Sequence, residues 1–163
     1  MNPTIIYYFT GTGNSLAIAR KIAEDTNAEL IGIPHALKNP HPIPKDASVG
    51  IIYPLYAGGL PSIVVRFLKS VSLAEAGYLF FVATEGGKMG APTSQISRLS
   101  KAAGHTTDAS WWIQMPDNYI PLSAPPQTPE QQKMYDAAKR KAAVISEAVK
   151  NREKHIEGMG FAG

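Results

Sequence analysis

The chain has 163 residues, no cysteine and a formal net charge of +3 at pH 7. This length fits a single domain, residues 1–163, with one hydrophobic core. The lack of cysteine excludes disulfides, thiolate metal sites, iron–sulfur clusters and a cysteine nucleophile within these residues.

The basic residues are scattered apart from clusters at 139–141 and 150–154, both in a helical pattern with alanines on the other face. This pattern favours a solvated helix surface over a nucleic-acid site, and the basicity is suited instead to docking an acidic redox partner. No charged leader precedes the first apolar segment, and no stretch approaches about 18 uninterrupted apolar residues. We therefore expect a cytoplasmic protein that neither spans a membrane nor binds nucleic acid.

The first informative segment is the loop 10–15, which reads Thr-Gly-Thr-Gly-Asn-Ser. It follows the apolar run 5–9, a predicted strand, and precedes residues 16–23, whose apolar spacing predicts a helix. The loop thus lies at a helix N-terminus, where free backbone N–H groups and the helix dipole favour a compact anion. Its three hydroxyl side chains add further donors.

The spacing of its residues distinguishes this loop from two better-known phosphate-binding motifs. A P-loop needs a lysine directly after its last glycine, and here no lysine occurs before Lys21. The dinucleotide fingerprint needs a third small residue three positions after its second glycine, where this chain has Leu16. A hydroxyl-rich loop without a basic residue fits the phosphate of a mononucleotide, and an ordinary Gly-rich turn is the alternative interpretation.

A second strand is predicted at 28–33, and the proline-rich segment 34–44 is predicted to be surface loop. That segment contains His35 and His41, but no third ligand is near in sequence, so no metal site is expected.

The third predicted strand, 49–53, ends at a loop with one aromatic residue and two glycines, Tyr56, Gly58 and Gly59. The loop leads through Pro61 into a predicted helix over 62–69. Flexible backbone beside an aromatic ring suits a planar ligand. A turn that needs the glycines only for left-handed dihedrals is the alternative.

The fourth predicted strand, 78–84, is apolar without alternation, which is typical of a strand covered by helices on both faces. It ends at a third glycine-rich loop, 84–90, and a helix is predicted over 92–103, where Gly104 ends it. The fifth predicted strand, 106–114, carries two tryptophans on opposite faces and leads to residues 115–120.

The last predicted helix begins at Thr128, because Thr128-Pro129-Glu130-Gln131 has the residues of an N-terminal capping box. We expect it to continue to about His155 and to bury a stripe of Met134, Ala138, Ala142, Ile145, Val149 and Ile156.

Five strands that alternate with helices predict an α/β fold, a three-layer sandwich with a parallel sheet and helices on both faces. For the strand order 2-1-3-4-5, a ligand binds beyond the carboxyl ends of the first and third strands, where the order reverses. The loops 10–15 and 54–59 follow these two strands.

With these loops, the segments 53–61, 83–87 and 115–119 make the chain resemble the flavodoxins. It looks most like the flavodoxin half of a bacterial and archaeal family in which flavodoxin is fused to a C-terminal ferredoxin module. Those relatives carry cysteine clusters after the flavodoxin part, whereas this chain has none. A free-standing domain and a fragment of a fused protein both fit this difference.

The resemblance implies a flavodoxin-like fold with bound FMN. The implied contacts are with Thr10, Gly11, Thr12, Gly13, Asn14 and Ser15 around the phosphate, Pro54, Leu55, Tyr56, Ala57, Gly58 and Gly59 on one side of the isoalloxazine, Thr84, Glu85, Gly86 and Gly87 on the other, and Asp117, Asn118 and Tyr119 as a further wall.

The implied function is electron transfer between redox partner proteins, among them a ferredoxin or an iron–sulfur module, without a catalytic residue or a metal. An NAD(P)H-dependent FMN or quinone reductase on the same fold is the alternative, but spacing places no catalytic residue for it. A phosphate-binding receiver-like domain is a third interpretation, and it lacks the acidic cluster that magnesium needs at the first strand's end.

Overall fold

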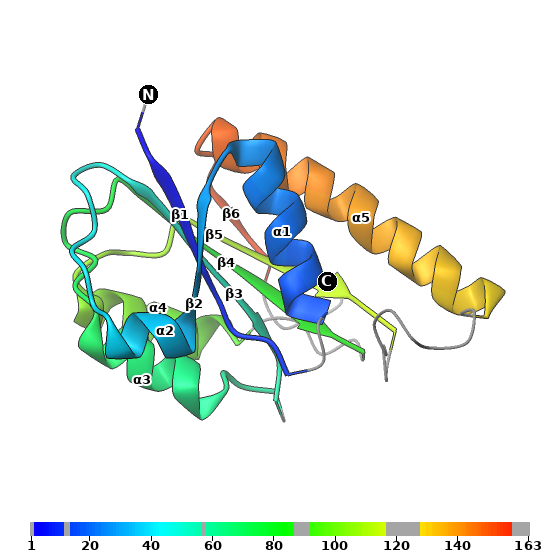
Figure 1. The fold of residues 1–163 in the computed structure, drawn as a ribbon, viewed down its shortest axis with the longest axis horizontal. Helices are drawn as coiled ribbons and strands as arrows, with labels where there is room; N and C mark the ends of the chain where they lie inside the picture. Colours follow the sequence, from blue (N-terminus) through cyan, green and yellow to red (C-terminus); the bar gives the residue numbers. More distant parts are fainter. Residues whose placement is uncertain (1, 12–13, 57, 87–91, 117–127, 158–163) are drawn as a thin grey trace.

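The central layer of the fold is a sheet whose paired strands all run parallel. The computed structural model describes residues 2–11, 14–56, 58–86, 92–116 and 128–157. Within these ranges the sheet has six strands in the order β2-β1-β3-β4-β5-β6 (Figure 1). The strands are β1 (Thr4–Tyr8), β2 (Glu29–Gly32), β3 (Ser48–Pro54), β4 (Tyr78–Glu85), β5 (Ala109–Gln114) and β6 (His155–Ile156).

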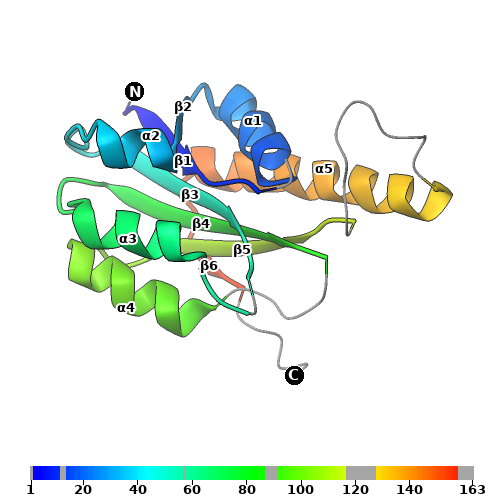
Figure 2. The ribbon, with the colours of Figure 1, turned by 60° about the horizontal axis from the view of Figure 1, so that its bottom comes forward.

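Helices cover both faces of this sheet, as Figure 2 shows, and the predicted order 2-1-3-4-5 is confirmed with one further strand at the β5 edge. This order is that of the flavodoxin-like doubly wound fold. One face carries α1 (Asn14–Thr26) and α5 (Pro129–Lys150), and the other carries α2 (Ile33–Lys38), α3 (Ser62–Ser70) and α4 (Thr93–Ala103).

Two hydrophobic cores result, because successive side chains of a strand point to opposite faces. On β4, Leu79 and Phe81 join the core under α2, α3 and α4, whereas Phe80 and Val82 join the core under α1 and α5. The predicted burial of this strand on both faces is confirmed. The sheet is close-packed at its centre, where a Cβ added to Gly50 would lie 2.2 Å from Phe80 Cζ.

The segment 34–44 was wrongly predicted as loop throughout, because α2 occupies Ile33–Lys38. Pro34 lies in the first turn of this helix, where a missing N–H costs nothing. Ile33 and Ala36 are buried against the neighbouring sheet, and this tertiary contact stabilises a helix too short to be stable alone.

The last helix has the predicted capping box: Gln131 N donates to Thr128 Oγ1 over 3.2 Å, and Thr128 N donates to Gln131 Oε1 over 3.0 Å. The prediction that it continues to His155 is wrong. The helix ends at Lys150, and Arg152 adopts a left-handed φ of 51° that turns the chain back toward the sheet. Ile156 consequently lies in β6 with 55% of its surface exposed, outside the predicted buried stripe.

Among the described residues, no helix combines the length and apolar character that crossing a bilayer would require.

Candidate functional site

The candidate site lies at the carboxyl edge of the sheet, where β1, β3, β4 and β5 all end. The strand order reverses between β1 and β3, and such a point is where open α/β sheets bind ligands. The structure brings the described residues of the predicted loops 10–15, 54–59 and 84–86 together here. The remaining predicted site residues, Thr12, Gly13, Ala57, Gly87, Asp117, Asn118 and Tyr119, lie outside the described residues.

One buried hydrogen bond joins the first loop to the end of β4. Ser15 Oγ and Thr84 Oγ1 are 2.9 Å apart, and the two residues are 1% and 2% exposed. A hydrogen bond between buried hydroxyls across 69 positions fixes the start of α1 against β4. One of the two hydroxyl protons is therefore used in this contact, and the start of the helix is held rigidly.

Asn14 joins the same helix start to the end of β5. Its Nδ2 donates to the carbonyl oxygen of Pro116 over 3.4 Å. Its Oδ1 is buried and has no hydrogen-bond partner among the residues that the structure describes. A buried acceptor without a partner is costly, and a ligand hydroxyl at the loop would satisfy it.

The loop after β3 is a tight turn. Tyr56 N donates to Gly59 O over 3.0 Å, and Gly59 N donates to Tyr56 O over 2.9 Å. Gly58 has a φ of 78°, a left-handed conformation that favours glycine. The two mutual hydrogen bonds hold this turn beside the carboxyl end of β3, where the Tyr56 side chain is 49% exposed.

Tyr56 also brings the loops after β1 and β3 into contact. A Cβ added to Gly11 would lie 2.7 Å from Tyr56 Oη, so the hydroxyl lies directly beside the Gly11 backbone. Phe9 packs edge-on against the Tyr56 ring, with centroids 6.4 Å apart and an interplanar angle of 88°. An exposed aromatic ring therefore lies next to the predicted phosphate loop.

Two glutamines that sequence reasoning missed support these loops. Gln95, in the first turn of α4, accepts a hydrogen bond from Leu60 N over 3.0 Å. Gln114, the last residue of β5, donates from Nε2 to Gly86 O over 3.4 Å. Both contacts are with backbone groups at least 28 positions away, so no local sequence pattern indicates them.

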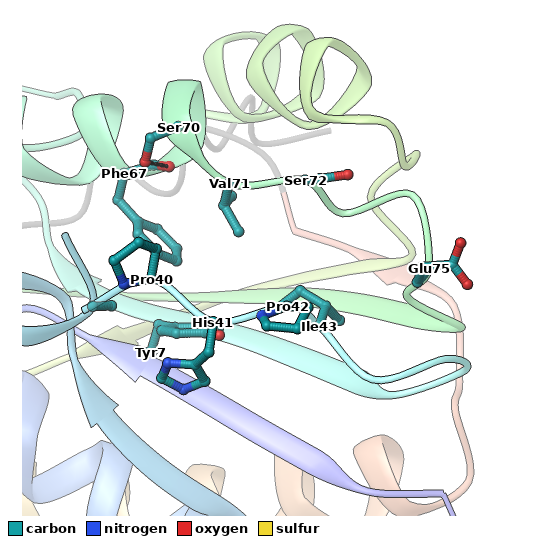
Figure 3. A pocket seen from close by; sticks show the side chains of 11 residues that line it. Tyr7, Pro40, His41, Pro42, Ile43, Phe67, Ser70, Val71, Ser72 and Glu75 are labelled. Atoms are coloured by element: carbon teal, nitrogen blue, oxygen red, sulfur yellow. Dashed lines mark hydrogen bonds between the residues drawn. The ribbon is translucent and has the colours of Figure 1, made fainter. Parts of the chain in front are cut away.

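A separate cavity of about 230 Å³ is lined by residues outside these loops, and Figure 3 shows it from close by. It lies among Tyr7, the segment 40–43 and the end of α3, near the amino ends of β3 and β4. Burial, and to a smaller extent the charge of Glu29, raises the pKa of Tyr7, which therefore stays a neutral phenol.

Among the described residues, no group of three or more His, Cys, Asp or Glu side chains is arranged to hold a metal ion.

Comparisons with known proteins identify the fold. No protein-family model matches the chain, and no curated protein matches its sequence. Among solved structures, it is similar to the Trp repressor binding protein from Bacillus subtilis, with a TM-score of 0.53 and 13% identity, over 87% of this chain and 96% of that one.

Two further structures are similar. A Bacteroides uniformis protein provisionally assigned as a flavoprotein has a TM-score of 0.51 and 14% identity, over 72% of this chain and 93% of that one. A flavodoxin from the domain Archaea has a TM-score of 0.46 and 17% identity, over 91% and 99% of the two chains. The likenesses to the Bacillus and Bacteroides proteins agree with the flavodoxin-like strand order and establish the fold alone.

Proposed function

We propose that this chain binds FMN non-covalently at the carboxyl edge of the sheet and passes electrons between redox partner proteins. One observation carries the proposal: loops far apart in sequence meet where the strand order reverses. Ser15 is hydrogen-bonded to Thr84, and Tyr56 lies against Gly11. A phosphate loop, a stacking ring and a second glycine-containing loop at one edge suit a mononucleotide with a planar ring system.

The first loop provides the anion site in this proposal. It has no basic side chain, so its donors are the backbone N–H groups at the start of α1 and the loop hydroxyls. The positive end of the helix dipole favours the phosphate. Asn14 Oδ1, buried without a partner, accepts a hydrogen bond from a ligand hydroxyl.

The loops 54–59 and 84–87 flank the flavin ring in this proposal, and residues 117–119 form a further wall. Bound FMN supplies the electron-transfer chemistry, and the protein supplies binding, orientation and the local field. Tyr56 offers a stacking face, and the carboxylate of Glu85 disfavours additional negative charge on the ring. The assignment of the similar Bacteroides uniformis protein as a flavoprotein supports this choice of ligand.

We further propose that the partners include a ferredoxin or an iron–sulfur module. The segments 53–61, 83–87 and 115–119, which resemble flavodoxins fused to ferredoxin, support this choice.

Two measurements on one preparation distinguish an electron carrier from an NAD(P)H-dependent reductase. We expect the FMN-loaded protein, once reduced anaerobically, to be reoxidised by a ferredoxin, and we expect it not to consume NADH or NADPH in steady state. The Tyr56→Ala variant should slow ferredoxin exchange, whereas Val144→Ala, another exposed apolar position, should not. Sustained NAD(P)H oxidation would instead assign the protein to the FMN or quinone reductases.

A further inference from the structure

A groove of about 550 Å³ runs along the outer flank of α4, beside β5 and β6. Side chains of α4, the turn at 106–107, Ser110 and Ile156 line it. Its volume lies in the range of small-molecule sites. The groove is separate from the loops 10–15 and 54–59, whose described residues do not line it.

A polar stripe of α4 forms one wall of this groove. Ser94, Ser97, Arg98 and Lys101 all line it, and their spacing of i, i+3, i+4 and i+7 places them on one side of a helix. The opposite side of α4 is buried in the sheet core. The helix therefore presents two hydroxyls and two cations together.

The charge of the groove is positive and unbalanced. Within the described part of the chain, Arg98 and Lys101 have no ion-pair or hydrogen-bond partner, and no described lining residue is a carboxylate. By contrast, Lys141, Lys150 and Arg152 each pair with an acidic side chain within 3.0 Å. Two unneutralised cations in a concave surface attract an anion.

The floor of the groove carries a buried hydroxyl without a partner. Ser110 is 1% exposed and lines the groove, and its Oγ makes no hydrogen bond within the described ranges. Buried polar atoms are nearly always satisfied, so an orphan atom at a cavity indicates a ligand that completes it. Beside it, Thr107 Oγ1 donates to Ser100 Oγ over 2.9 Å, which holds the neighbouring turn against α4.

An apolar surface completes the groove. Ile156, at the β6 edge, is 55% exposed and lines it, as does the buried Ile96. We propose that the groove binds a small phosphate monoester. Arg98 and Lys101 bind its dianionic phosphate, the hydroxyls of α4 and Ser110 hydrogen-bond its oxygens, and its organic part packs on Ile156.

The test follows backbone amide shifts of the FMN-loaded protein by NMR during titration with AMP, ribose 5-phosphate, glycerol 3-phosphate and inorganic phosphate. The amide shifts locate binding, so a phosphate at the loop 10–15 is distinguished from one in the groove. We expect at least one ester to shift Ser97, Ser110 and Ile156 with saturation. The matching compound without phosphate should bind at least tenfold more weakly.

Matched variants test the assigned groups. We expect the double variant Arg98→Gln/Lys101→Gln to weaken this binding at least tenfold and Ser110→Ala to weaken it severalfold. The double variant Arg66→Gln/Lys69→Gln changes two exposed cations with the same spacing on α3 and should bind as the parent does.

Three results would overturn the proposal. One is the absence of saturable shifts in the groove with all four probes. Another is equal weakening of ester binding by the two double variants, which would indicate that binding depends on net charge alone. The third is binding of inorganic phosphate as tight as that of every ester. This result would indicate an adventitious ion only, because the organic part of the ester would then gain nothing from the apolar surface.

Discussion

At the scale of single residues, the candidate site depends on a close approach between Gly11 and Tyr56. The Tyr56 hydroxyl would lie 2.7 Å from a Cβ at Gly11, which is closer than a Cβ atom approaches other heavy atoms, while the next ring atom, Cζ, would lie 4.0 Å away. Gly11 is not in the left-handed region, so an alanine there is strained only by this hydroxyl.

This geometry makes a double substitution informative. We expect Gly11→Ala to weaken FMN binding about tenfold, or about 1.4 kcal/mol, because Tyr56 is displaced from the phosphate loop. Gly11→Ala/Tyr56→Phe should restore most of the affinity, because the colliding oxygen is removed.

Fluorescence titration with FMN measures both constants. Gly32→Ala is the matched control, because its Cβ would meet the Tyr8 hydroxyl at an ordinary 3.5 Å. Equal affinity of Gly11→Ala and the parent would contradict the assigned contact.

A second residue, Tyr53, affects stability and its pH dependence. Its hydroxyl is buried without a partner in the described part of the chain, and burial raises the pKa of the phenol. Removing an unsatisfied buried hydroxyl should raise the free energy of unfolding of Tyr53→Phe at pH 7 by about 1 kcal/mol.

The sign of the pH effect follows from the raised pKa. Only the unfolded phenol ionises near its usual value of about 10, so stability is complete below that pH and is lost as pH rises above it. Urea unfolding at neutral and alkaline pH should show a shallower alkaline loss in Tyr53→Phe. A residual loss remains because burial also raises the pKa of Tyr7 and Tyr78. Parallel curves with no gain at pH 7 would be inconsistent with this assignment.

At the scale of elements, the loops of the site are fixed by helices that contact them. Gln95 of α4 accepts from Leu60 N directly after the Tyr56 turn, and Ser15 of α1 contacts β4. The residue that follows the Tyr56 turn and the start of α1 are therefore each held by a contact within the protein.

The support by α4 can be tested with an isosteric apolar side chain. Gln95→Met leaves Leu60 N without its acceptor, so we expect a loss of stability of about 1 kcal/mol and weaker FMN binding. Gln132→Met, which removes an exposed contact with Asp136 on α5, should change neither quantity by more than about 0.5 kcal/mol. Equal effects of the two changes in thermal unfolding and FMN titration would refute the supporting role of Gln95.

The elements also explain what the sequence can predict. Apolar runs that stop at glycine or proline identify the five main strands, and Thr128 with Gln131 identifies the start of α5, because these signals are local. The two-residue β6 pairs through its backbone, with Glu157 N donating to Ser110 O over 2.9 Å, and its side chains carry no strand signal.

For the candidate site too, some residues can be predicted from local sequence and others only from the fold. The loop at 10–15 is visible in the sequence because glycines and hydroxyls cluster there. Gln95 and Gln114 act on backbone groups of other loops, and only the fold brings them near.

At the scale of the whole molecule, the parallel order puts the loops after β1, β3 and β4 on one edge, and the charge is +3 from 16 Lys and Arg against 13 Asp and Glu. A basic protein is attracted to an acidic partner at long range, and salt largely screens this attraction beyond about 8–10 Å at physiological ionic strength.

We therefore expect electron exchange with an acidic ferredoxin to slow as ionic strength rises from about 0.01 to 0.5 M, by about tenfold or more. Stopped-flow reoxidation of the reduced, FMN-loaded protein measures this rate, with a small neutral oxidant as the control whose rate stays constant. A rate that is independent of salt for both oxidants would exclude electrostatic docking.

The most direct test of the central claim is the visible spectrum of the protein after incubation with FMN and removal of free flavin. We predict a yellow protein with one FMN per chain, and a Gly11→Ala variant that retains less FMN while its far-ultraviolet circular dichroism is unchanged. A colourless, folded protein that retains no FMN would contradict the account.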